Sequence, residues 1–137
     1  MKSIKAIVAG SVFIIIVILL LQLVYIFVAV AYNSLAKDFP LLNDIAGSFR
    51  YIIGIPIFIA TMFVGGYITA NIANMQTRGK MLMHCLTVGL LTAGGMIYPT
   101  LENSDITTTG IVIFVLAIAA TTVGGLYWER NTVVNQL

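Results

Sequence analysis

The sequence is poor in charged residues, which make up only 9% of its 137 residues. A soluble domain carries roughly 25% charged residues, so this chain has too few charges to cover a surface that faces water. Hydrophobic residues make up 60%, whereas disordered chains are polar and weakly hydrophobic. The composition therefore excludes both a soluble globular domain and a disordered chain, and it predicts an integral membrane protein.

Cysteine and histidine each occur once, as Cys85 and His84. A single thiol excludes an internal disulfide and any CxxC zinc or redox motif. A single imidazole does not supply the paired axial ligands of a haem-binding bundle. Lys and Arg together number 7 and form no cluster that could neutralise a run of phosphates. We therefore expect no cofactor and no nucleic-acid partner.

Four apolar runs approach the length of about 20 residues that a helix needs to cross a bilayer. Because lipid offers no hydrogen-bond partners to the backbone, each run should be helical. We expect an all-α fold, a single domain that is a bundle of four transmembrane helices. The expected spans cover about residues 6–32, 51–73, 81–98 and 110–128. The first run is longer than the 7–15 apolar residues of a signal peptide, so we expect an uncleaved anchor.

The distribution of Lys and Arg predicts the orientation, because basic residues accumulate on the cytoplasmic side. Two basic residues, Lys37 and Arg50, lie on one side of the predicted bundle. The other five lie on the opposite side with both termini: Lys2, Lys5, Arg78, Lys80 and Arg130. We expect both termini to be cytoplasmic and the protein to be a multi-pass protein of a bacterial inner membrane. Tyr127 and Trp128 would then be aromatic anchors at the inner interface.

The first outer loop, Asn33–Arg50, contains apolar residues at helical spacing: Phe39, Leu42, Ile45 and Phe49. This spacing predicts a short helix lying on the membrane surface. Such a helix could be a lid or a docking surface for a partner. The alternative that we favour is a loop that dips into the headgroups.

Small residues recur every four positions in the last three spans. In lipid, such residues let two helix backbones approach closely, and four-residue spacing places them on one face. We therefore expect these spans to form a close-packed core. The predicted packing residues are Thr61, Gly65, Gly66, Thr69, Ala73, Gly89, Ala93, Ala117, Thr121 and Gly125.

The first span differs, because the stretch 12–21 is bulky all round and contains no glycine. It could pack loosely on the other helices, face lipid, or face another subunit. Its strongly polar residue, Gln22, is expected near mid-membrane. Gln22 could line a pore together with Asn71 and Thr87, or it could hydrogen-bond a neighbouring helix. We favour the hydrogen bond.

The interiors of the four runs contain no Asp, Glu, Lys or Arg. Ionisable groups inside a membrane usually mark function, so their absence argues against an enzyme or a proton-coupled pump. His84 remains a candidate pH sensor, metal ligand or lipid-phosphate contact, with Arg78 and Lys80 nearby as a basic rim. The alternative that we favour is an interfacial histidine bonded to a backbone carbonyl or to water.

Two glycine doublets stand in similar contexts, at Val64-Gly65-Gly66-Tyr67 and Val123-Gly124-Gly125-Leu126-Tyr127. Together with Gly79-Lys80 and Gly89-Leu90-Leu91, these doublets give residues 51–128 a glycine pattern that resembles a group of small bacterial four-span membrane proteins of unknown function. The resemblance implies a four-helix architecture and implies no activity.

We expect a non-catalytic accessory or assembly subunit of a larger membrane complex. Its partners would be the lipid bilayer and other membrane subunits, or further copies of itself. The alternative is a homo-oligomeric channel or small-solute transporter. A membrane enzyme that uses His84 is the third and last hypothesis.

Overall fold

The computed structural model describes residues 2–35, 50–74, 77–102 and 108–134. Helices account for nearly all of these residues, and no strand occurs among them. The α-helices are α1 (Lys2–Leu35), α3 (Ile55–Ala73), α4 (Arg78–Glu102) and α5 (Thr108–Val134). One π-helical turn, η1 (Arg50–Gly54), leads into α3. The prediction of an all-α chain is confirmed.

Three of the described helices are long and apolar enough to cross a membrane. These candidate spans are Ser3–Tyr32, Ile52–Ala73 and Thr108–Thr132. They correspond to the first, second and fourth apolar runs, as expected where helix length follows run length. The third run is also helical, and α4 extends beyond its predicted bounds at both ends. The expected surface helix of the first loop falls on residues 36–49, outside the described part of the chain.

The two ends of α3 have local causes. Pro56 lies in the first turn of this helix, where its missing N–H leaves no intrahelical bond unmade. At the other end, Asn74 adopts a left-handed conformation with φ 42°. Its backbone N–H donates to the carbonyl oxygen of Ala70 at 2.9 Å, which closes the helix. The chain therefore turns here, and α4 begins at Arg78.

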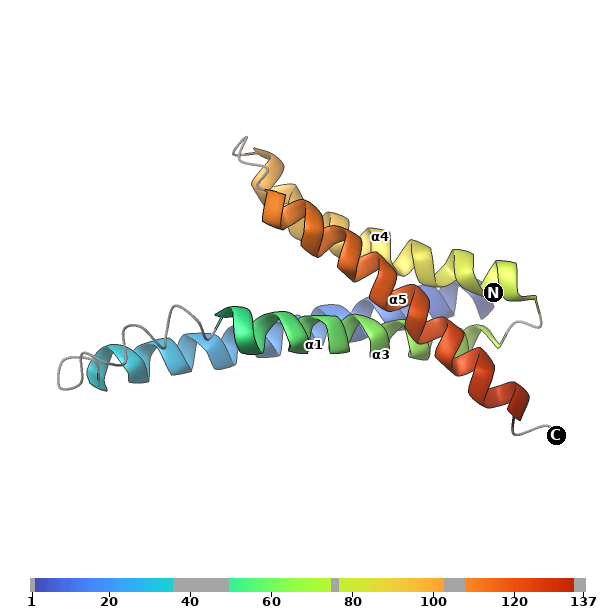
Figure 1. The fold of residues 1–137 in the computed structure, drawn as a ribbon, viewed down its shortest axis with the longest axis horizontal. Coiled ribbons are helices and arrows are strands. Elements are labelled where there is room, and N and C mark those ends of the chain that lie inside the picture. Colours follow the sequence, from blue (N-terminus) through green and yellow to red (C-terminus); the bar gives the residue numbers. More distant parts are fainter. Residues whose placement is uncertain (1, 36–49, 75–76, 103–107, 135–137) are drawn as a thin grey trace.

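The helix α3 contacts α1, α4 and α5, and its contact with α5 is the most extensive between any two helices. Figure 1 shows α1 and α3 side by side along their lengths, with α5 crossing α3 and α4 lying beside α5. Away from the chain's N-terminus, α4 and the first half of α5 lean away from α1–α3, and beyond its crossing with α3 the C-terminal end of α5 diverges from α4 (Figure 1). The bundle is therefore wedge-shaped rather than a set of parallel rods.

The two halves of α1 have different surroundings. Its N-terminal half contributes Ala6, Gly10 and Ile14 to the buried interior at four-residue spacing. Seven consecutive residues of the other half, 22–28, are all exposed. The bulky stretch 12–21 predicted a first span without a stripe of small residues. The structure places such a stripe just before that stretch, and α1 packs closely there.

Candidate functional site

The glycine doublet of α3 serves two different neighbours. Gly65 faces α1, where a methyl group at its Cα would collide with the side chain of Ile14. Gly66 faces α5, where a methyl group would collide with the backbone of Thr121. Successive residues of a helix point about 100° apart, so one doublet can admit two helices. Gly10 completes the α1 contact, because a methyl group there would collide with the side chain of Thr69.

The doublet of α5 has the same arrangement with different partners. Gly124 faces α3, and a methyl group at its Cα would collide with the carbonyl oxygen of Phe63. Gly125 faces α4, and a methyl group there would lie 2.5 Å from the sulfur of Cys85. The two doublets therefore connect the helices in the order α1, α3, α5, α4. The two similar sequence contexts therefore have the same structural role: each doublet lets its helix pack closely against two neighbouring helices.

The ten residues proposed for packing are all buried in the structure. Gly89 of α4 belongs to the same system, since a methyl group there would lie 2.5 Å from Thr121 Oγ1 and 3.2 Å from Ile118 Cα. Sequence reasoning missed Ala6 and Gly10, although their four-residue spacing was a usable signal. The close contacts therefore extend to all four helices rather than to three.

The hydroxyl groups of the core threonines are hydrogen-bonded within their own helices. Each hydroxyl donates to the carbonyl oxygen four residues earlier, at 2.7–3.1 Å. These bonds satisfy the hydroxyl donors within each helix, and Thr92 Oγ1 also lies 3.7 Å from Met62 Sδ on α3. The residues concerned are Thr61, Thr69, Thr87, Thr92, Thr121, Thr122 and Thr132.

Two direct hydrogen bonds join different helices toward the end of the bundle where α3 ends and α4 begins. The indole Nε1–H of Trp128 donates to Asn71 Oδ1 at 3.1 Å, and the thiol of Cys85 donates to the carbonyl oxygen of Gly66 at 3.5 Å. Trp128 is only 8% exposed and packs with Ala70, Met81 and Cys85. The tryptophan expected as an interfacial anchor therefore turns inward.

The predicted basic rim is partly neutralised within the chain. Arg78 Nε lies 3.4 Å from Glu129 Oε2, so α4 and α5 are joined by an ion pair. His84 Nδ1 lies 2.6 Å from the carbonyl oxygen of Lys80, one turn earlier. The carbonyl can only accept, so Nδ1 carries the hydrogen in this arrangement. This geometry is the one that we favoured for His84.

The three residues of the proposed polar path make no hydrogen bonds with one another in the described structure. Asn71 is bonded to Trp128, and Thr87 donates to the carbonyl oxygen of Met83 at 2.7 Å. Gln22 lies far from Asn71, because α1 and α3 run antiparallel, with Gly10 opposite Thr69 and Gly65 opposite Ile14. Eight residues past Ile14 along α1 therefore correspond to eight residues before Gly65 along α3.

By this register Gln22 lies level with Ile57, near the start of α3. That start is also the start of the second candidate span, at Ile52. This register places Gln22 nearer to that end than to the middle of the second candidate span, because α1 has 34 residues and is longer than a bilayer requires. The midpoint of the apolar run is not the midpoint of the bundle.

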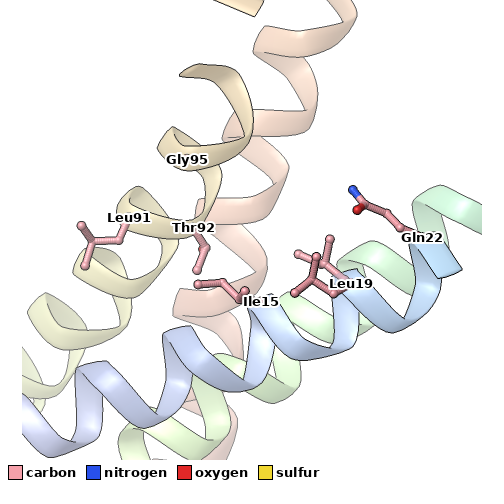
Figure 2. Close-up of a pocket in the computed structure, with 7 residues that line it drawn as sticks. Ile15, Leu19, Gln22, Leu91, Thr92 and Gly95 are labelled. Carbon is pink, nitrogen blue, oxygen red and sulfur yellow. The ribbon is translucent and has the colours of Figure 1, made fainter. Parts of the chain in front are cut away.

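A notch opens between α1 and α4 where the two helix pairs diverge. It has a volume of about 530 Å³, and five of its lining residues are exposed. Figure 2 shows Thr92 pointing from α4 toward Ile15 on α1, while the amide of Gln22 lies at the open end. The notch is lined by Ile15, Ile18, Leu19 and Gln22 from α1 and by Leu91, Thr92 and Gly95 from α4.

The notch is apolar apart from two side chains. The hydroxyl of Thr92 is already bonded, to the carbonyl oxygens of Val88 and Gly89 and to the sulfur of Met62. The amide of Gln22 makes no hydrogen bond with any described residue. Of these two side chains, Gln22 is therefore the one whose polar group can hydrogen-bond a ligand.

One further polar atom lacks a partner among the described residues. Ser11 Oγ is enclosed and makes no hydrogen bond there. Ser11 precedes Ile15 by one helical turn and Ile18 by two, so it lies on the α1 face that lines the notch. An enclosed hydroxyl without a partner costs free energy, and Ser11 is therefore a weak point in the α1 interface.

Within the described residues, no group of three or more His, Cys, Asp and Glu side chains could hold a metal ion. Comparison with known proteins finds no matching family model, no matching curated protein and no matching solved structure.

Proposed function

We propose that the protein is a non-catalytic accessory or assembly subunit of a larger complex in a bacterial inner membrane. One observation carries the proposal: the outer half of α1 extends from the bundle with seven consecutive exposed residues, 22–28. Apart from Gln22, these residues are large and apolar. Seven residues cover about two turns, so every side of this segment is available to another transmembrane helix.

The proposal includes four membrane spans with both termini inside. Its support is the length of α4, whose 25 residues extend about 37 Å at 1.5 Å per residue. Lys5, Arg78, Lys80 and Arg130 also lie at one end of the bundle, where the N-terminus, the start of α4 and the end of α5 are found (Figure 1). An excess of basic residues at one end is typical of the cytoplasmic side.

The uses of the core polar groups support a structural role. The core threonines bond to their own helices, and Asn71 is held by Trp128. These bonds leave few polar groups in the described core that could act on a substrate or line a continuous water path. The large remaining surface is apolar helix, which suits association with other helices or with lipid.

The test is photocrosslinking in native membranes followed by gentle purification. A photoreactive phenylalanine analogue replaces Phe27, which is 67% exposed on outer α1, or Val115, a matched control that is 58% exposed on α5. We expect Phe27 to crosslink a foreign membrane subunit that also co-purifies in stoichiometric amount, and we expect Val115 not to do so. Crosslinks only between copies of this chain would contradict the proposal and favour the homo-oligomeric alternative.

A further inference from the structure

We infer that the notch between α1 and α4 binds one glycerophospholipid, whose acyl chain lies in the notch and whose ester carbonyl accepts a hydrogen bond from Gln22. This inference goes beyond the proposed role as a subunit. It concerns a small-molecule site, not a protein interface. Three features of the notch support it: its size, its walls and the depth of its polar group.

The size of the notch favours a chain-like ligand over a protein helix. Its volume is about 530 Å³, within the 300–1,000 Å³ that is typical of ligand pockets. Its lining extends over about two turns of α1, from Ile15 to Gln22, which is much shorter than a transmembrane helix. An acyl chain is thinner and can follow the notch lengthwise.

The walls match a hydrocarbon chain. Ile15, Ile18 and Leu19 form one side and Leu91 the other, and Thr92 has its hydroxyl bonded within the protein. Gly95 leaves room on the α4 side, because a methyl group at its Cα would meet nothing within 4 Å. The notch lies open at its side, so a lipid can enter from the surrounding bilayer without any movement of the helices.

The depth of Gln22 matches the ester group of a lipid. Gln22 follows Lys5 by 17 residues, which is about 25 Å along a helix, while the hydrocarbon core is about 30 Å thick. It also lies five residues inside the Ile52 end of the second candidate span, by the register with α3. Gln22 is therefore close to the edge of the hydrocarbon, where lipid ester carbonyls are found. Its NH₂ group can donate to such a carbonyl.

The first experiment uses the whole purified protein, delipidated in mild detergent and titrated with dioleoyl phosphatidylglycerol under native mass spectrometry. We expect one tightly bound lipid per chain. Gly95→Leu fills the notch and should reduce occupancy at least about tenfold, since it removes the space for the chain. Gly94→Leu is the matched control, because Gly94 also has open space at its Cα but does not line the notch. Equal binding by the two variants would overturn the site.

The second experiment tests the hydrogen bond with a diether analogue of the same lipid, which lacks the ester carbonyls. Wild-type protein should prefer the diester by roughly three- to tenfold, as expected for one hydrogen bond in a membrane. Gln22→Leu should bind both lipids equally. A wild-type protein without preference would remove the role of Gln22. Because Gln22 is exposed, Gln22→Leu should fold even if Gly95→Leu does not.

The remaining outcomes are also decisive. No lipid bound by the wild-type protein would overturn the inference. Loss of a co-purifying polypeptide in Gly95→Leu, with lipid binding unchanged, would assign the notch to a protein partner and would equally overturn it. Neither result alters the crosslinking pattern expected at Phe27, so failure of the lipid site and failure of the proposed subunit role can be told apart.

Discussion

Trp128 on α5 donates its indole N–H to the amide oxygen of Asn71 on α3, at 3.1 Å. Each residue had a different expected role from sequence, Trp128 as an interfacial anchor and Asn71 as part of a polar path. In the structure each side chain provides the hydrogen-bond partner of the other. The bond closes the end of the bundle where α3 and α5 leave their crossing point, and it ties a buried aromatic side chain to a fixed orientation.

This bond should appear as a coupling energy between the two side chains. Trp128→Phe and Asn71→Leu each remove one partner, and the double variant should lose less stability than the sum of the two. We expect a coupling of about 0.6 kcal/mol and at most about 1.7 kcal/mol, the range measured for such bonds in membranes. Unfolding in mixed micelles with increasing SDS measures it. Trp128→Phe combined with Thr87→Val is the control, and additivity in both cycles would contradict the bond.

The doublet glycines should tolerate no methyl group where they meet backbone. Gly66→Ala places a methyl group against the backbone of Thr121, which cannot rotate away. We expect a loss of about 1–3 kcal/mol in unfolding free energy, typical of overpacking. Gly94→Ala, with open space around its Cα, should be neutral or stabilising by up to about 1 kcal/mol, since alanine favours helix. Thermal unfolding in detergent compares the two, and equal effects would contradict this packing.

A collision with a side chain, unlike one with backbone, should be repairable. Gly125→Ala brings a methyl group within 2.5 Å of Cys85 Sγ and should destabilise the bundle. Adding Cys85→Ala removes the sulfur and should recover most of the loss. The matched pair Gly66→Ala with Thr121→Ala should show no such recovery, because the obstacle at Gly66 is backbone. Recovery in both pairs, or in neither, would contradict the contacts of the doublets.

The enclosed hydroxyl of Ser11 predicts a stabilising substitution. Ser11→Ala removes a polar atom that has no partner among the described residues and leaves the rest of the α1 interface in place. We expect a gain of up to about 1 kcal/mol in unfolding free energy. Ser3→Ala, at a half-buried serine eight residues earlier and near the chain end, is the control and should change little. A clear loss of stability in Ser11→Ala would mean that the hydroxyl is bonded.

The helices could be predicted from sequence because apolar run length and the needs of the backbone in lipid dictate them. The small residues that pack could also be chosen from their spacing. Gly10 was overlooked because it precedes the bulky stretch of the first span. The neighbour that each glycine faces depends on helix rotation and order around the bundle, which spacing alone does not specify. The level of Gln22 in the bundle could not be derived from the apolar run, because α1, with 34 residues, is longer than a bilayer requires.

The bonds that the core threonines make within their own helices have a consequence for biogenesis. A side chain whose hydroxyl already donates to the carbonyl oxygen one turn earlier needs no hydrogen-bond acceptor on another helix. Each helix can therefore enter the bilayer singly. Association afterwards depends mainly on the fit of the glycine surfaces, with added contacts from the Trp128–Asn71 and Cys85–Gly66 bonds and the Arg78–Glu129 ion pair. Because shape complementarity involves no proton or counter-ion, the joined state should be indifferent to pH and salt over much of its interior.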